Sequence, residues 1–243
     1  MSLPRVLQVD ETNTSYPRLT SSVIPEFGDI LHDPDSFAQI QDMVVLNTTQ
    51  FLSPELVYGN ELDVEIIVEP CLCECGIYVL SDGHAMTEFT KIGVVFQQNT
   101  VYVNTENSSL DNSTYKGQDQ IYVHNWNGNT ENIKLRVIID HSIIEVFVNN
   151  GINVITERVY PTLSSSLNVG LYANNGNCIF KTIQAWNVNA IFDNIASPPD
   201  VKENNDMSQI RLQFSLTYFA LVKFFDCCML KQKYNVPCLG ILI

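Results

Sequence analysis

The chain has 243 residues, 45% of them hydrophobic, so it is long enough to bury the core of one large β domain or two small ones. It has 13 basic and 27 acidic residues and a formal net charge of −14. A chain this acidic repels phosphate backbones, which argues against nucleic acid as a partner. Seven cysteines at this length do not form a dense disulfide framework.

Residues 1–41 are rich in Pro, Asp, Ser and Thr and show no sustained hydrophobic period, so we expect a mostly irregular lead-in. The N-terminus has no apolar run of signal-peptide length, although Asn-x-Ser/Thr glycosylation patterns recur. This combination predicts that the ancestral protein began upstream of Met1. The acceptor asparagines are Asn13, Asn47, Asn107 and Asn112.

From Asp42 onward, short apolar runs alternate with turn signals such as Asp82-Gly83 and Asn175-Gly176. Many short strands without a convincing amphipathic helix predict an all-β fold, a two-sheet antiparallel β-sandwich over residues 42–192. The expected strands are residues 43–47, 62–69, 76–80, 89–96, 100–104, 120–124, 133–139, 142–148, 152–159, 167–173 and 178–188.

Three cysteines, Cys71, Cys73 and Cys75, are spaced two residues apart. This spacing places their sulfurs on one face of a strand, whereas zinc sites usually use Cys-x-x-Cys turns that wrap the ion. His84 or Cys178 could complete a site only if the fold brought them there. We therefore expect buried or locally oxidised thiols and no metal ion.

The best-patterned stretch of the chain is residues 133–162. Residues 133–139 alternate apolar and polar side chains, and a second apolar strand follows at residues 142–148. Asn150-Gly151 tolerates the positive φ angles of a type I′ turn, so residues 142–148 and 152–159 should pair as a hairpin.

Asp140, His141, Ser142 and Glu145 form the densest polar cluster of this stretch. Neighbours along a strand face opposite sides, so the order Asp-His-Ser does not imply a catalytic triad. Glycoside hydrolysis needs two carboxylates about 5 to 9 Å apart, a distance that a sequence does not define. We interpret the cluster as the polar start of a strand with Glu145 on its outer face, and we assign no catalytic residue.

Isolated histidines at positions 32, 84 and 124 are interpreted as ordinary surface or loop residues. Trp126 and Trp186 could form an aromatic platform for sugars, although aromatic residues on strands more often belong to a core.

Residues 193–206 are rich in Asp, Asn, Pro and Lys and predict a linker at a domain boundary. The apolar tail that follows, residues 210–243, is interrupted by Lys223 and Asp226, which argues against a membrane-spanning helix. We expect an amphipathic segment packed on the sandwich, or sequence never selected as protein.

Residues 135–162, LRVIIDHSIIEVFVNNGINVITERVYPT, resemble the C-terminal β-sandwich of glycoside hydrolase family 32, which contains invertases, fructan hydrolases and related fructosyltransferases. The resemblance is carried by DHSIIEVF at residues 140–147 and RVYPT at residues 158–162. Residues 171–188 resemble the closing strands of those enzymes. Leu3-Pro4-Arg5 is similar to a segment near the end of their catalytic domain.

The resemblance implies an active site in a five-bladed propeller that precedes the sandwich, with aspartates in Asn-Asp-Pro and Arg-Asp-Pro motifs and a glutamate in a Glu-Cys motif. This chain has no Asn-Asp-Pro, and we interpret Asp33-Pro34 and Glu74-Cys75 as coincidences. A five-bladed propeller needs about twenty strands. The residues before Leu62 could supply one blade at most.

The resemblance therefore implies an accessory sandwich that lacks its catalytic propeller, needs no cofactor and does not hydrolyse sucrose alone. Asp140, Ser142 and Glu145 are its expected polar contacts with a propeller or a second sandwich. A different possibility is that the chain is part of an active fructan- or sucrose-hydrolysing glycosidase whose catalytic half is missing from it or comes from another chain. The sandwich could also be a lectin-like module for fructose-containing saccharides, and the tail could tether the domain to membranes. Family members are usually secreted, cell-wall or vacuolar.

Overall fold

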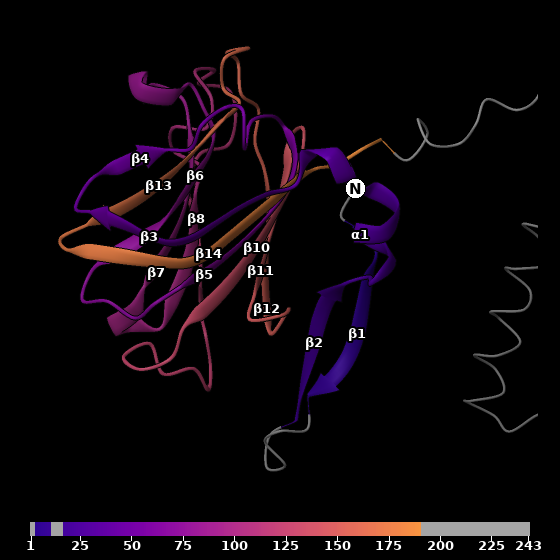
Figure 1. The fold of residues 1–243 in the computed structure, drawn as a ribbon, viewed down its shortest axis with the longest axis vertical. Coiled ribbons are helices and arrows are strands. Elements are labelled where there is room, and N and C mark those ends of the chain that lie inside the picture. The colour runs from indigo at the N-terminus through magenta and orange to yellow at the C-terminus, as the bar shows by residue number, and fades with distance from the viewer. Residues whose placement is uncertain (1–2, 11–16, 191–243) are drawn as a thin grey trace, which may run out of the picture. The chain divides into compact units, whose positions relative to one another are not determined.

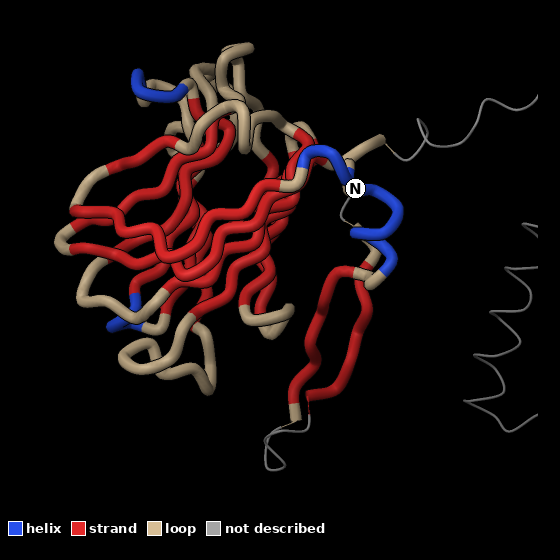
Figure 2. The backbone as a smooth tube through the Cα atoms, in the orientation of Figure 1, coloured by secondary structure: helices blue, strands red, loops and turns tan. Residues whose placement is uncertain are grey.

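The computed structural model describes residues 3–10 and 17–190, and the regular structure of these residues is mainly β-strand (Figure 1). Two six-stranded antiparallel sheets form a sandwich, and a two-stranded hairpin precedes them (Figure 2). The chain divides into two units, residues 1–194 and 195–243, and only the first contains described residues.

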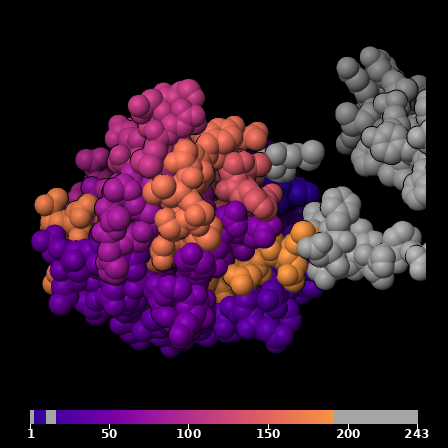
Figure 3. Space-filling view, turned by 90° about the horizontal axis from the view of Figure 1, so that it is seen from above, coloured from indigo at the N-terminus to yellow at the C-terminus, as the bar shows by residue number. Residues whose placement is uncertain are grey.

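The first sheet has the strand order β12-β11-β10-β5-β14-β3. Its strands are β3 (Ala38–Leu46), β5 (Glu61–Val68), β10 (Ile133–Asp140), β11 (Ile143–Val148), β12 (Asn153–Arg158) and β14 (Asn177–Asn187). The central strand β5 pairs with both β10 and β14, so strands distant in the sequence lie side by side. Figure 3 shows the same proximity of distant segments, because residues near the end of the described chain, in orange, lie against early residues in indigo and purple.

The second sheet has the order β4-β13-β6-β7-β8-β9. Its strands are β4 (Thr49–Phe51), β6 (Glu74–Ser81), β7 (Thr90–Val95), β8 (Thr100–Asn104), β9 (Gln118–Tyr122) and β13 (Asn168–Asn174), and short 3-10 helices lie at η1 (Pro34–Ser36), η2 (Gly83–Ala85) and η3 (Phe96–Gln98). The predicted two-sheet antiparallel sandwich is confirmed. Each expected strand corresponds to one of the strands β3 and β5–β14.

The core between the sheets follows the alternation of the sequence. Leu62, Val64 and Ile66 of β5 are at most 1% exposed, and Leu135 and Val137 pair with them from β10. Burying a side chain of this size contributes about 1.5 to 3 kcal/mol. The period-2 pattern therefore identified the face that turns toward the second sheet.

The hairpin of β11 and β12 pairs as predicted, but its turn is longer than expected. Val148 is opposite Asn153, which leaves a four-residue loop in place of a two-residue turn at Asn150-Gly151. Asn149, Asn150 and Gly151 all have positive φ angles, and the amides of Gly151 and the residue after it donate to the carbonyl of Val148. The turn is longer than predicted because Asn149, in addition to Asn150, adopts the left-handed backbone conformation.

The lead-in of residues 1–41, expected to be mostly irregular, contains regular structure. Its elements are β1 (Arg5–Asp10), β2 (Arg18–Val23) and α1 (Glu26–Leu31), and β3 begins within it. The helix is too short to show a hydrophobic period, although Phe27 and Leu31 on one of its faces are both buried. β1 and β2 leave several of their apolar side chains exposed, so they show no clean alternation between a dry and a wet face.

Several expectations fall outside the described residues. They are the linker at residues 193–206, the apolar tail at residues 210–243 and the glycosylation pattern at Asn13. Within the described ranges, no helix is long and apolar enough to cross a membrane.

Glu88 ties two long loops to the second sheet. Its side chain is 0% exposed, and its carboxylate accepts five hydrogen bonds. Burial alone would raise its pKa, but these hydrogen bonds hold the pKa below the usual value. The donors are the amide (2.7 Å) and hydroxyl (2.7 Å) of Thr162, the amides of Leu163 (2.9 Å) and Leu110 (3.1 Å), and the hydroxyl of Ser166 (2.5 Å).

We predict that Glu88→Gln lowers the free energy of unfolding by about 3 kcal/mol at neutral pH. The substitution replaces one carboxylate oxygen by an NH2 group, which cannot accept a hydrogen bond from the surrounding donors. A carboxyl group with a lowered folded pKa stabilises above its unfolded pKa, and this stability is lost as the pH falls through the folded value. The deficit of the variant should therefore shrink below about pH 4.5. Urea unfolding across pH, with exposed Glu55→Gln as control, checks this; equal deficits for both variants would contradict it.

Glu157 and Asp119 place two carboxyl groups together between the edge strands β12 and β9 of the two sheets. Glu157 is 8% exposed. Its burial and its hydrogen bond with Asp119 raise the pKa of Glu157 to about 7. Glu157 therefore keeps its proton to a higher pH than an exposed glutamate does.

We predict that the sandwich loses stability as the pH rises from about 4.5 to about 7, because a carboxyl group with a raised folded pKa favours folding only while it is protonated. Glu157→Gln should flatten this part of the curve, since the amide resembles the protonated acid. Melting temperatures from pH 5 to pH 8 give the measurement. Parallel curves for the variant and the unmodified chain would refute the assignment.

Candidate functional site

The outer face of the first sheet, turned away from the sandwich core, is covered by the lead-in. A second apolar cluster forms there from Val23, Phe27 and Leu31 of the lead-in and from Ile138 and Phe147 of strands β10 and β11. Figure 1 shows α1 and the β1–β2 hairpin on the side of the sandwich that carries β10 to β12. The outer face is therefore a docking surface already occupied by this chain's own first segment.

Glu145 binds the start of the lead-in. The side chain lies on the outer face of the sheet and is only 1% exposed, because the lead-in covers it. Its carboxylate accepts from the amide of Leu3 at 2.8 Å and from Nη2 of Arg5 at 2.9 Å. The Arg5 guanidinium also donates to Thr156 and lies 5.3 Å from the ring centre of Phe147. One carboxylate thus holds both the backbone and the cation of the Leu-Pro-Arg segment.

Asp63 holds the helical part of the lead-in. This carboxylate, 0% exposed, accepts from Nε of Arg136 at 3.0 Å and 3.1 Å and from its Nη2 at 2.5 Å. His32, which follows α1, contributes Nε2 at 2.8 Å and stacks its ring on Trp186 at 4.5 Å. Burial alone would raise the pKa of Asp63, but hydrogen bonds from His32 and Arg136 hold it below the usual range. We call these four residues the Asp63 clamp.

The β11–β12 turn fixes the hairpin of the lead-in. The amide of Ser21 in β2 donates to the carbonyl of Gly151 at 2.8 Å. Gly151 has a φ of +87°, and a Cβ there would lie 2.2 Å from the carbonyl oxygen of Ser21. Only glycine allows this close approach.

The three residues predicted to contact a propeller or a second sandwich have different surroundings. Glu145 contacts the lead-in, whereas the side chain of Asp140 is 64% exposed and bonds only to Nδ1 of His141 at 3.0 Å among the described residues. Ser142 lines an open pocket of about 530 Å³ together with Asn60 and Tyr160. Asp140 is the last residue of β10, and Ser142 lies in the turn before β11.

His32 corrects the interpretation of the histidines as isolated surface or loop residues, since it belongs to the Asp63 clamp. No local pattern could have shown this, because its partner lies 31 residues away in the sequence. His84 is exposed and contacts the ring of Phe51. Trp126 is 5% exposed in the core. The tryptophans therefore do not form an aromatic platform together.

The dipeptides that resemble catalytic motifs lie apart. Asp33 caps the 3-10 helix η1 by accepting from the amide of Asp35. Glu74 accepts from Lys91 and from Tyr102, both at 2.5 Å, within the second sheet. Each carboxylate thus has a structural partner.

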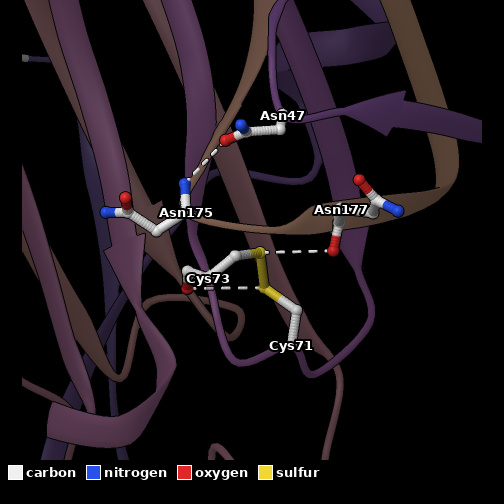
Figure 4. Close-up of a disulfide and its surroundings, with 5 residues drawn as sticks. All are labelled: Asn47, Cys71, Cys73, Asn175 and Asn177. Carbon is white, nitrogen blue, oxygen red and sulfur yellow. Dashed lines mark hydrogen bonds between the residues drawn. A yellow bond between two sulfur atoms is a disulfide. The ribbon is translucent and has the colours of Figure 1, made fainter.

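Four cysteines meet where the two sheets converge. Cys71 and Cys73 form a disulfide (Figure 4). Cys75 and Cys178 are buried free thiols. Three expected glycosylation sites are exposed, at Asn47, Asn107 and Asn112.

We predict that Asp63→Asn destabilises the chain by about 3 kcal/mol, because it leaves the Arg136 guanidinium without its buried counter-ion. Hydrogen exchange should accelerate most in α1, which the clamp holds. Asp140→Asn is the matched control, since that carboxylate is exposed, and it should change the free energy of unfolding by less than about 0.5 kcal/mol. Unchanged exchange in α1 after Asp63→Asn would disprove the role of the clamp.

The curated relatives that this chain resembles are enzymes named for fructosides. An acid beta-fructofuranosidase from Vicia faba is 32% identical over 130 residues, which are 48% of this chain and 19% of that protein. A fructan 6-exohydrolase from Beta vulgaris is 31% identical over 159 residues, 57% of this chain and 26% of that protein. The chain thus spans about a quarter or less of these relatives.

Solved structures share the fold. Fructan 1-exohydrolase IIa from Cichorium intybus superposes with a TM-score of 0.63 at 18% identity, covering 77% of this chain and 41% of that one. Exo-inulinase from Aspergillus awamori gives a TM-score of 0.67 at 14% identity, covering 78% and 36%.

A family model described as "Glycosyl hydrolases family 32 C terminal" matches residues 28–187. This range begins in α1 and ends with β14, so it includes the whole sandwich and all four residues of the Asp63 clamp. The chain therefore belongs to glycoside hydrolase family 32, and its sandwich is the C-terminal domain of that family.

Proposed function

We propose that this chain is the accessory C-terminal sandwich of a fructoside-cleaving enzyme, inactive by itself, and that its lead-in is the attachment to a catalytic propeller domain. The observation that carries the proposal is the hold of Glu145 and Asp63 on the lead-in. Two buried carboxylates set the position of a segment that would connect two domains. A rigid connection of this kind would transmit the position of one domain to the other.

The β1–β2 hairpin supplies the surface for attachment. Leu7 and Val9 of β1 and Leu19 of β2 lie on one face of the hairpin and are 60 to 62% exposed. An isolated two-stranded hairpin is marginally stable in water, and its edges offer unpaired backbone groups. Pairing with a further strand or packing under another sheet would cover both. A catalytic domain with a β-sheet blade has the required chemistry.

The chain's own carboxylates support an inactive accessory role. Asp63, Glu74, Glu88 and Glu145 all accept hydrogen bonds from structural partners. A glycosidase needs a pair that faces an open sugar site. The activity named for the relatives would then reside in the part of those proteins that this chain does not span.

The test is complementation. The full chain is co-expressed with the Vicia faba acid beta-fructofuranosidase from which the matching C-terminal region has been deleted, and sucrose hydrolysis and co-purification are measured. We expect no hydrolysis by this chain alone and recovery of activity in the complex. Hydrolysis by the chain alone would overturn the proposal.

The hairpin's role has its own matched variants. Leu7→Asp with Val9→Asp should weaken association at least about tenfold, because each apolar side chain buried at an interface contributes about 1.5 to 3 kcal/mol. Leu46→Asp, equally exposed at 63% but on β3 of the sandwich, should leave association unchanged. Equal effects of both changes would exclude the hairpin as the attachment surface.

A lectin-like role for the sandwich stays a prediction. The pocket beside Ser142, with the 45% exposed ring of Tyr160 and the amide of Asn60, supplies stacking and hydrogen bonds of the kind that bind sugars. Calorimetric titration of the full chain with a short fructan tests it. Heat of binding that disappears in Tyr160→Ala would support this role, and absence of heat would refute it.

A further inference from the structure

All four cysteines of the described residues converge on one point. Cys71 and Cys73 lie in the loop before β6, Cys75 lies on β6 of the second sheet, and Cys178 lies on β14 of the first sheet. Their sulfur atoms all lie within 4.8 Å of one another. Other small apolar side chains would fill the core equally well. Core packing alone therefore does not explain why cysteines from two distant segments meet.

We propose that Cys71, Cys73, Cys75 and Cys178 form a redox-gated site for a thiophilic divalent cation such as Zn²⁺. The cation binds after the Cys71–Cys73 disulfide is reduced and is excluded while the disulfide is present. A tetrahedral zinc site with four thiolates has Zn–S bonds of about 2.3 Å, which places its sulfurs about 3.8 Å apart. Once the disulfide pair has separated, the cluster therefore needs to contract by about 1 Å at most.

The two halves of the site differ in freedom. Cys75 and Cys178 are 0% exposed, and each lies on a strand that pairs with neighbours in its own sheet, so they define fixed positions in the core. Cys71 is only partly buried, and the neighbouring side chain of Leu72 is 83% exposed. The loop can therefore move the sulfur of Cys71 toward the buried sulfurs, and a reductant can reach the disulfide from this side.

The surroundings hold Cys73 in position. Its Sγ lies 3.4 Å from the carbonyl oxygen of Asn177, and Sγ of Cys71 lies 3.4 Å from the carbonyl oxygen of Cys73 (Figure 4). The turn before Asn177 is fixed because Asn47 Oδ1 accepts from the amide of Asn175 at 2.8 Å. A cation bound here would connect β6 and β14 and so join the two sheets.

The chemistry balances with a phosphine as the reductant. The disulfide gains two electrons and two protons to give two thiols, while the phosphine takes oxygen from water and becomes a phosphine oxide. The cation then binds four sulfurs as thiolates, and four protons are released. The bound site carries a net charge of −2.

The test uses the full chain with Cys227→Ser, Cys228→Ser and Cys238→Ser, because those cysteines lie outside the described residues and would compete for metal. The reduced chain, freed of metal and shown to be folded by circular dichroism, is titrated with Co²⁺. We expect one cobalt per chain with thiolate-to-cobalt absorption, displacement by Zn²⁺, and none of these in the oxidised chain. A reduced chain without this absorption, or an oxidised chain that shows it, overturns the proposal.

Two variants separate the cluster from adventitious binding. Cys178→Ala removes the ligand from β14 and should weaken cobalt binding at least about tenfold, since even outer-shell changes at metal sites cost that much. Cys71→Ser changes a loop residue, so the sandwich should still fold, and it should weaken binding in the same way. Affinity unchanged in either folded variant would show that the cobalt is bound elsewhere.

Discussion

Asp63 places a negative charge beneath the lead-in with no solvent access, and the position of the whole N-terminal segment depends on how that charge is neutralised. Arg136 approaches from the neighbouring strand β10 and His32 from the end of α1, so the two elements must meet at the same carboxylate. Removing Arg136 would leave an uncompensated buried charge, and removing His32 would remove one of the hydrogen bonds that Asp63 makes. The clamp therefore converts a short helix, which would not be stable alone, into a fixed part of the fold.

The outer face of the first sheet carries two kinds of contact that act on the same segment. Glu145 and Asp63 orient the lead-in through hydrogen bonds. Phe147 and Ile138 supply the apolar surface on which α1 and β2 pack. Along β10 and β11, the side chains that face the lead-in alternate with the side chains that face the core. The sheet is thus partly or fully buried on both faces along most of β10 and β11, although Lys134 and Arg136 of β10 alternate with apolar residues as on a strand with one exposed face.

Two further carboxylates respond to pH in opposite directions. Glu88 is surrounded by donors, so its charged form is favoured and the loops around Thr162 close on it. Glu157 faces Asp119 at the open edge of the sandwich, so its protonated form is favoured there. The difference lies in the partners, not in the side chain, because donors stabilise a carboxylate and a second carboxylate destabilises it.

The sequence by itself determined the strands of the sandwich other than β4, the pairing of β11 with β12, and the family, because alternation at period 2 and a contiguous motif are local properties. It also placed Glu145 on the outer face. Only the tertiary structure decided what Glu145, Asp63 and His32 contact, that the lead-in has regular structure, and that Cys178 lies beside the Cys71–Cys73 disulfide. These contacts join residues from 31 to 142 positions apart, and neither a buried charge nor a sulfur cluster has a periodic signal along the chain.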